Sequence, residues 1–248
     1  MKSIGIIPVR MESTRLPQKP LRMICGLPMI HHVIKRAQMC GSLADLYVAT
    51  DSEKIAELSD QAGCKFIMTK PSHKTGTDRI CEAIQHIQAD TIVNIQGDEA
   101  LVRPEHIDAS IECLTDNKDI GVAMLGVKFE KLNSPSDIKI VLNKNQEIMY
   151  FSRNDIPTNS TRGKCSMLKA YHLVSFRRNM LEQFASWERT PLEKIEVIEY
   201  LRILEKGHKI ACKIVDSPAI SVDTLEDLKT VSKLMKRDNL INLYKHTL

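Results

Sequence analysis

Short apolar runs alternate with amphipathic segments through the first half of the chain, and this alternation limits the possible folds more than any other feature. Four runs indicate buried strands, at residues 3–9, 46–49, 65–68 and 91–95. Between them, apolar residues recur at helical spacing over residues 29–37, 53–62 and 78–87, and Gly63 is placed to end the second helix. Parallel strands joined by helices need cover on both faces, so the pattern predicts an α/β fold with a central, mostly parallel sheet and helices on both faces.

The second half of the chain is richer in strands. Strand patterns occupy residues 122–127, 138–142, 147–151, 168–175 and 209–215, and helical patterns occupy residues 191–204 and 225–235. A polar stretch at residues 143–146 favours a turn between two of these strands. The sequence contains no internal repeat, low-complexity tract or linker. We therefore expect one domain over residues 1–248, with mixed-sheet additions, built from a half at 1–118 and a half at 119–248.

Composition argues against several classes of protein. The 35 basic and 31 acidic residues leave a net charge of +4, which is too small an excess to indicate nucleic acid as the main partner. No segment approaches the roughly 20 apolar residues of a membrane span, and the start of the chain is too short and strand-like for a signal peptide. We expect a cytoplasmic protein that binds neither nucleic acid nor membrane.

The cysteines favour reduced thiols over a disulfide framework or a zinc site. They are odd in number, scattered, and without a C-x-x-C pair. The seven are Cys25, Cys40, Cys64, Cys81, Cys113, Cys165 and Cys212.

The segment after the first strand carries the densest chemistry. Arg10, Arg15 and Lys19 place three cations within ten residues. Ligands of open α/β sheets bind beyond the carboxyl ends of the strands, where this segment is expected. Backbone N–H groups near Ser13 and Thr14 are suited to cradle a triphosphate while the cations neutralise it. A solvated basic loop is the alternative that these residues leave open.

Asp98 follows the predicted strand at residues 91–95 and is preceded by Gly97. Glycine lets the backbone approach a ligand closely, and a carboxylate facing a nucleotide is the usual way to hold Mg²⁺ against phosphate oxygens. A turn or cap residue is the alternative reading of an aspartate at this place.

Ten segments follow, in order, the signature of a known family. They are residues 10–20 (RMESTRLPQKP), 26–30 (GLPMI), 48–51 (VATD), 68–69 (MT), 75–79 (TGTDR), 93–99 (VNIQGDE), 138–141 (IKIV), 150–153 (YFSR), 191–196 (PLEKIE) and 222–228 (VDTLEDL). Through them the chain resembles the CMP-Kdo synthetases, or 3-deoxy-manno-octulosonate (Kdo) cytidylyltransferases, over residues 3 to about 234. The resemblance implies a Rossmann-like nucleotidyltransferase fold, a β-rich insertion for sugar binding and dimerisation, dependence on Mg²⁺, and a homodimer.

The resemblance also implies a reaction. CTP and a Kdo-like 3-deoxy ulosonic acid would give a CMP-sugar and pyrophosphate, by in-line attack of a sugar hydroxyl on the α-phosphate, as in lipopolysaccharide biosynthesis. The first half of the chain would bind mainly the nucleotide and the second half mainly the sugar.

Individual roles follow from the matched motifs. The resemblance assigns catalysis to Arg10, Lys19 and Asp98, and Mg²⁺ binding to Asp98 and Asp223. The implied nucleotide-binding residues are Pro8, Arg10, Ser13, Arg15, Lys19, Thr69, His73, Gly76, Thr77, Arg79 and Gln96. The implied sugar-binding residues are Gln96, Arg153, Lys169, His172, Glu199 and Tyr200. A surface histidine is an equal alternative for His73.

The sugar half departs from the family at three positions. Ala170 and Val174 replace a histidine and a tyrosine expected to contact the sugar, and Tyr200 replaces a glutamine. A buried sugar hydroxyl without a partner costs free energy, so we expect Kdo to be a poor substrate and a different ulosonic acid to be preferred. Drift, with the correspondence shifted by one or two residues near Ala170, is the alternative. Arg177 is a further candidate for the sugar carboxylate, although it also fits a helix start.

Two other functions stay open. The chain could activate another surface-polysaccharide sugar acid, or use another nucleotide, on the same fold. It could also be a non-catalytic nucleotide-binding relative, although the presence of both Asp98 and Asp223 argues against lost catalysis.

Overall fold

The computed structural model describes residues 1–13, 15–158 and 166–246. Its contacts divide the chain into two compact units, residues 1–108 together with 219–248, and residues 109–218. The C-terminal segment, expected in the second half, therefore belongs to the first unit. The expectation of one domain over residues 1–248 stays a prediction. Thr14, expected to help cradle phosphates, and Cys165 lie outside the described residues.

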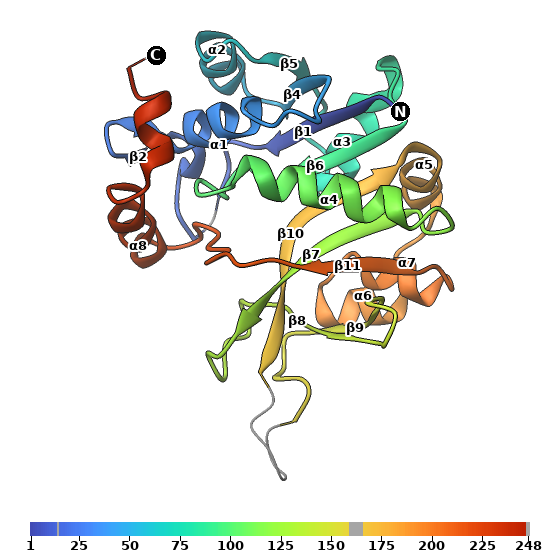
Figure 1. The fold of residues 1–248 in the computed structure, drawn as a ribbon. Coiled ribbons are helices and arrows are strands. Elements are labelled where there is room, and N and C mark those ends of the chain that lie inside the picture. The colour runs from blue at the N-terminus through green and yellow to red at the C-terminus, as the bar shows by residue number, and fades with distance from the viewer. Residues whose placement is uncertain (14, 159–165, 247–248) are drawn as a thin grey trace. The chain divides into compact units, whose positions relative to one another are not determined.

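The first unit is built on four parallel strands in the order β6-β1-β4-β5 (Figure 1). They are β1 (Ser3–Val9), β4 (Asp45–Thr50), β5 (Lys65–Met68) and β6 (Thr91–Ile95), so all four strands predicted for this half are confirmed. In register, Ile6 pairs with Tyr47 on one side and with Asn94 on the other. The chain extends the sheet first on one side of β1 and then on the other. This topology opens a crevice at the carboxyl ends of β1 and β6.

Three helices connect these strands, and their ends follow local sequence signals. They are α1 (Met29–Gln38), α2 (Glu53–Gln61) and α3 (Gly76–Ala83), the last continued by the 3₁₀ turn η2 (Ile84–His86). Beyond α2, Gly63 takes a φ of 67°, as its predicted role requires. The α3 helix begins two residues before its predicted start, because Thr75 and Asp78 form a capping box that satisfies its first N–H groups. The predicted α/β class, a sheet flanked by helices, is confirmed (Figure 1).

The loop after β1 and the C-terminal segment share one hydrophobic cluster. The loop contains η1 (Lys19–Leu21) and the small hairpin β2 (Met23–Ile24) and β3 (Leu27–Pro28), and the C-terminal segment contains α8 (Leu225–Met235) and η3 (Asn239–Leu243). Leu16 and Ile24 pack with Val222, Val231 and Met235, all at most 1% exposed. This packing fixes the start of α8 close to the loop after β1.

A buried arginine anchors the end of the C-terminal segment. Arg36 on α1 is 0% exposed. Its Nη2 lies 2.8 Å from Asp238 Oδ2, and its Nε donates to the Tyr244 hydroxyl at 3.1 Å. The same hydroxyl lies 2.8 Å from Nδ1 of His32, which is also buried. A buried guanidinium needs this compensation, so the network holds η3 and its flanks against α1.

One helix has no counterpart among the predictions. The α4 helix (Pro104–Asp116) starts at a proline, which the first helical turn tolerates. Ile107, Ile111 and Leu114 recur at helical spacing and are buried. This periodicity is visible in the sequence and would have predicted the helix.

In its described residues, 109–158 and 166–218, the second unit contains five strands, and all of the strands predicted for this half are confirmed. They are β7 (Val122–Phe129), β8 (Lys139–Leu142), β9 (Ile148–Ser152), β10 (Met167–Arg177) and β11 (Ile210–Ile214). The β11 strand pairs with β7 in parallel, whereas β7–β10, β10–β8 and β8–β9 are antiparallel. The register of β10 against β7 shifts between Tyr171 and Val174, which marks a β-bulge. After β10 the chain enters α5 (Arg178–Ser186) with Arg177 as N-cap, as its alternative reading proposed.

The prediction of one continuous helix over residues 191–204 is wrong. The structure has α6 (Pro191–Glu196) and α7 (Leu201–Glu205), separated at Val197, whose φ of 55° is left-handed. Glu193 and Arg202 form a buried pair, with Nε–Oε2 and Nη2–Oε1 distances of 2.8 and 2.6 Å. This bidentate pair, buried between the two short helices, accounts for a break that residue periodicity does not show.

Among the described residues, no helix is long and apolar enough to cross a bilayer. In the same part of the chain, no group of three or more His, Cys, Asp or Glu side chains converges as metal ligands would. The six cysteines that the structure describes are free thiols.

Candidate active site

A polar cavity lies in the first unit beyond the carboxyl ends of β1 and β6, where the strand order predicts a ligand crevice. It is lined by Pro8, Val9, Arg10, Glu12, Ser13, Arg15, Lys19, Pro20, Met29, His73, Lys74, Thr75, Gly76, Arg79, Gln96, Gly97, Asp98 and Asp223. Most of the residues expected to bind nucleotide or metal are therefore brought together from four separate segments of the chain.

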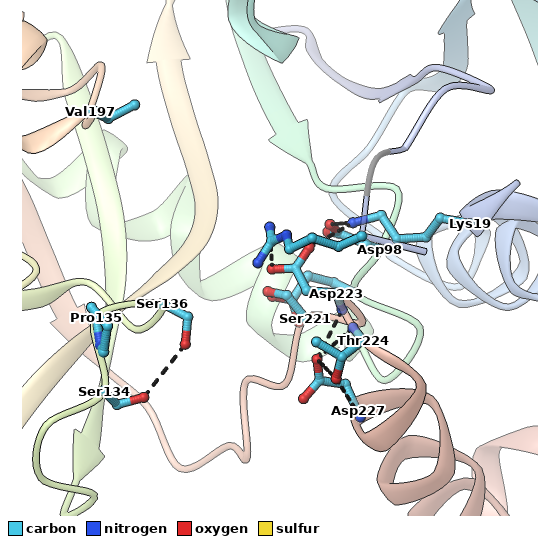
Figure 2. Close-up of polar contacts among 12 residues, drawn as sticks. Lys19, Asp98, Ser134, Pro135, Ser136, Val197, Ser221, Asp223, Thr224 and Asp227 are labelled. Carbon is cyan, nitrogen blue, oxygen red and sulfur yellow. Dashed lines mark hydrogen bonds and ion pairs between the residues drawn. The ribbon is translucent and has the colours of Figure 1, made fainter. Parts of the chain in front are cut away.

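Lys19 lies between the two aspartates that were expected to hold a metal. Its Nζ is 2.6 Å from Asp98 Oδ2 and 3.0 Å from Asp223 Oδ1 (Figure 2). Arg15 completes the cluster, with Nη2 3.0 Å from Asp223 Oδ2. Two cations from the loop after β1 thus neutralise two carboxylates, one from the loop after β6 and one from the residues just before α8.

The charge on Lys19 is secured by its neighbours. Burial by itself lowers the pKa of an ammonium, but the ion pairs with Asp98 and Asp223 outweigh it and raise the pKa of Lys19 above its ordinary value. Lys19 is therefore protonated throughout the physiological pH range. A permanent cation at the floor of this cavity suits an anionic ligand such as a phosphate.

Local hydrogen bonds place Asp223. The N–H of Asp223 donates to Asp227 Oδ2 at 3.1 Å, and Thr224 and Asp227 form the capping box of α8. On the other side, the N–H of Val222 donates to the carbonyl of Asp98 at 3.1 Å. Asp227 therefore caps the helix, while Asp223 faces the cavity.

Two glycines, Gly76 and Gly97, allow the segments that contain them to pack closely against the end of β1. A Cβ on Gly97 would lie 2.8 Å from Val9 Cγ2 and 3.3 Å from the Pro8 carbonyl oxygen. A Cβ on Gly76 would meet Pro8 Cγ at 3.2 Å. The physical reason for glycine at position 97 is thus close packing against β1, in addition to any approach of a ligand.

Arg79 is held rigidly at the cavity wall. Its Nη2 lies 2.7 Å from Asp51 Oδ2, and its Nη1 donates to Thr69 Oγ1 at 2.5 Å. Thr69 and Thr77, both expected to bind nucleotide, are buried and do not line the cavity. In the structure Thr69 contacts Arg79, whose guanidinium it helps to orient.

His73 lines the cavity and is not a free surface side chain. Its Nε2 pairs with Glu82 Oε2, and the same oxygen accepts the N–H of Lys70 at 3.0 Å. Hydrogen bonding to His73 is the main cause that lowers the pKa of Glu82 below its ordinary range. A partnered histidine on the wall is suited to contact a base.

Sequence reasoning did not select several cavity residues. Glu12, Lys74 and Thr75 line the cavity beside residues that were selected. Lys74 and Thr75 lie within the loop next to His73 and Gly76, so proximity to the quoted motif was the available signal. Met29 was assigned to the helix core, and only the fold shows that it also reaches the cavity wall.

The residues expected to bind the sugar lie in the second unit, apart from Gln96. All three guanidinium nitrogens of Arg153 donate to backbone carbonyls, at Glu196 (2.7 Å), Pro135 (2.9 Å) and Val197 (3.1 Å). Lys169 Nζ lies 2.6 Å from Asp137 Oδ1.

The remaining sugar candidates of this unit differ in burial. His172 and Glu199 are half-buried, whereas Tyr200 is 3% exposed and lies near the rings of Phe151 and Phe176. Arg177 donates to the carbonyls of Leu114, Asn117 and Ile120, which gives it a structural role at the start of α5. Sugar binding by these residues stays a prediction.

Asp98 and Asp223 form a suitable but incomplete donor set for Mg²⁺. Mg²⁺ is held by oxygen ligands, and in nucleotide sites typically by one or two carboxylates plus substrate phosphates. Asp98 and Asp223 share a single ammonium, so their carboxylates converge on one point. These residues fit an ion that arrives with a nucleotide.

A cation-rich loop after β1 and paired carboxylates at the edge of a parallel sheet define a nucleotide-binding α/β enzyme of the nucleotidyltransferase class. The sequence profile of the cytidylyltransferase family matches residues 4–210. The chain belongs to the 3-deoxy-manno-octulosonate cytidylyltransferase (CMP-Kdo synthetase) family, and it is a CTP-dependent nucleotidyltransferase.

Similarity extends over almost the whole chain. The 3-deoxy-manno-octulosonate cytidylyltransferase of Fusobacterium nucleatum is 41% identical over 97% of this chain and 99% of the relative. The enzyme of that name from Escherichia coli is 34% identical, over 96% of this chain and 97% of its own length. A solved structure of CMP:2-keto-3-deoxy-manno-octonic acid synthetase in complex with CTP is 34% identical, has a TM-score of 0.91, and aligns over 96% of this chain and 99% of its own.

Proposed function

We propose that the protein transfers the cytidylyl group of CTP to a Kdo-like 3-deoxy ulosonic acid, in a reaction that depends on Mg²⁺. The observation that carries this proposal is the cluster in which Lys19 and Arg15 meet Asp98 and Asp223 in one cavity. Family membership supplies CTP as the nucleotide, and the names of the relatives indicate the sugar.

The chemistry follows from charge placement. Arg10, Arg15 and Lys19 would bind the triphosphate and stabilise the charge on the departing pyrophosphate. The sugar hydroxyl gives up its proton to solvent and its oxygen forms a bond to the α-phosphorus, while the bond from that phosphorus to the bridging oxygen breaks and releases pyrophosphate. No covalent nucleophile is needed, because phosphoryl transfer depends on positioning and electrostatics.

Asp98 and Asp223 are the residues that would hold Mg²⁺. When bound there, Mg²⁺ would neutralise phosphate charge and lower the pKa of the attacking hydroxyl. Turnover in EDTA equal to that in excess Mg²⁺ would contradict this part of the proposal.

The burial of three residues bears on the acceptor sugar. Ala170, Val174 and Tyr200 are 1%, 0% and 3% exposed, so their side chains are enclosed by the protein's own residues. Because these three positions are enclosed, replacing a polar side chain there removes few hydrogen-bonding groups from the open surface that a sugar would contact. This placement supports Kdo itself, or a close analogue, over the strongly altered sugar that the substitutions suggested.

One assay tests both nucleotide and sugar. Pyrophosphate release would be measured with CTP, UTP, ATP and GTP, each with Kdo, a panel of other 3-deoxy sugar acids and sugars without a carboxylate. We expect turnover with CTP and Kdo, and none with sugars that lack the carboxylate. A higher kcat/KM for a different ulosonic acid would restore the altered-specificity hypothesis, and the absence of turnover with every acid would favour a non-catalytic relative.

We also propose a homodimer. Three apolar side chains of the second unit are exposed: Met149 at 61%, Ile195 at 75% and Val197 at 65%. Large exposed apolar side chains in one region favour protein–protein contact. Light scattering should give a mass of two chains, and Ile195→Lys should shift it towards one if this surface is the interface.

A further inference from the structure

Two loops that carry the aspartates of the active site are joined by a hydrogen bond that no step of the proposed chemistry uses. The hydroxyl of Ser221 donates to Glu99 Oε1 at 2.5 Å, across 122 residues of chain. Ser221 stands two residues before Asp223, and Glu99 directly follows Asp98. Figure 2 shows Ser221 beside the pair of aspartates, on the strand of chain that leads into α8.

Glu99 is not placed as a third ligand. Its side chain is enclosed, with the residue 3% exposed, and it does not line the cavity. Within the described part of the chain, no three carboxylates converge into a metal-binding group. The buried carboxylate therefore faces the loop of Ser221 while Asp98 faces the cavity.

The bond acts together with another attachment between these loops, because the N–H of Val222 donates to the Asp98 carbonyl at 3.1 Å. A single hydrogen bond leaves a segment free to pivot, whereas two bonds at separate points remove that rotation. Rotation matters here, because Asp98 and Asp223 carry like charges that repel when no cation lies between them.

We propose that Glu99 and Ser221 are positioning residues that hold the carboxylates of Asp98 and Asp223 at the spacing required by a shared metal ion. This inference rests on the proposed metal role of the two aspartates. Neither residue touches substrate, and both act through the backbone to which an aspartate is attached. Residues that orient metal ligands typically change metal affinity by 10- to 100-fold when they are substituted.

The test compares CTP affinity with and without metal, by calorimetry, in Ser221→Ala, Ser221→Thr and Ser232→Ala. Ser221→Thr retains the hydroxyl. Ser232→Ala is a matched control on the same C-terminal segment, where the Ser232 hydroxyl donates to the Leu228 carbonyl at 2.7 Å, away from the aspartates. In EDTA all three variants should bind CTP as the wild type does, since no residue that contacts phosphate has changed.

In Mg²⁺ the variants should separate. We expect the tightening of CTP binding by Mg²⁺ to fall by about tenfold in Ser221→Ala and to be kept in Ser221→Thr and Ser232→Ala. A merely structural serine would instead lower stability to urea and change both CTP affinities together. Ser221→Ala with the full Mg²⁺ effect would overturn this inference alone. A wild-type protein whose CTP affinity is the same in EDTA and Mg²⁺ would overturn the proposed metal site as well.

Discussion

At Lys19, burial and charge act in opposite directions on one ammonium group. Its side chain is 17% exposed, and the carboxylates that compensate it are 22% and 28% exposed. Such partly buried pairs are screened less by solvent than surface pairs are. The sequence predicts a cation here, but the position and charge of the Lys19 ammonium depend on its ion pairs with Asp98 and Asp223.

We expect Lys19→Met to weaken CTP binding by about 10- to 100-fold, because the variant loses a hydrogen bond to a charged phosphate group. Lys74→Met is the matched control, since Lys74 also lines the cavity and carries the same charge but is exposed to solvent. Calorimetric titration of CTP into each variant measures the effect. Equal losses in the two variants would mean that only the total charge of the cavity matters.

Asp98→Asn and Asp223→Asn should each lower kcat by a factor of about 10² to 10³, equivalent to about 3–4 kcal/mol, because a neutral amide cannot balance the charge of a metal ion. Stability to urea should change little, since the amide still accepts a hydrogen bond from Lys19. Asp90→Asn, at an exposed carboxylate before β6, should keep the wild-type rate. Near wild-type turnover of Asp223→Asn would leave that aspartate only a structural role.

At the scale of elements, strand order decides where the chemistry lies. The strand β1 has β4 on one side and β6 on the other, so the loops after β1 and β6 end at one edge of the sheet. Helix α8 adds Asp223 to that edge from the far end of the sequence. The α6–α7 pair shows the opposite case, in which a buried ion pair overrides a helical pattern.

Glu193→Gln should lower the free energy of unfolding by about 3 kcal/mol, because the buried guanidinium of Arg202 loses its charge partner. Hydrogen bonds from Arg202 contribute to a lowered pKa of Glu193 despite its burial, so the pair stabilises the fold above the unfolded-state pKa and this contribution is lost as pH falls through the folded-state pKa. Urea unfolding at neutral and acid pH measures both effects. Glu182→Gln, in an exposed pair with Arg178, should cost less than about 0.5 kcal/mol.

At the scale of the molecule, the chain leaves the first unit at residue 108 and returns to it at residue 219. The returning segment brings Asp223 to the cavity and ends in the Arg36 network. We therefore expect activity to depend on contacts between the two ends of the sequence, and damage to the C-terminal anchor to reach the active site through α8.

Asp238→Asn should reduce stability by about 2–3 kcal/mol, since it removes the carboxylate opposite the buried Arg36. Burial raises the pKa of Asp238, but the bond to Arg36 outweighs it and lowers that pKa overall. The stabilisation is thus present above the unfolded-state pKa and is lost as pH falls through the folded-state pKa. Chemical unfolding of Asp238→Asn and of the exposed control Asp60→Asn measures the difference, and equal stability would mean that the hydrophobic cluster alone holds the segment.

The sequence predicted features that depend on neighbouring residues more accurately than features that depend on residues far apart in the chain. Strands such as Ser3–Val9 and Thr91–Ile95, and helix Leu225–Met235, have their predicted bounds, because apolar periodicity and capping residues act over a few positions. The cluster of Arg15, Lys19, Asp98 and Asp223 was selected through motif resemblance, and the fold brings its members together. Thr69 and Thr77 were expected to bind nucleotide, and the structure shows that both are buried and absent from the cavity lining, because sequence does not show which side of a loop a residue takes.

The sequence by itself determined the α/β class, the loop of cations after the first strand and the family, because these are written in local patterns and motifs. Only the tertiary structure decided that Lys19 lies between aspartates up to 204 residues away, that the predicted helix is interrupted at Val197, and that Ser221 donates a hydrogen bond to Glu99. The reason is physical: such contacts depend on how buried surfaces pack and how buried charges find partners, which involves residues far apart in the chain.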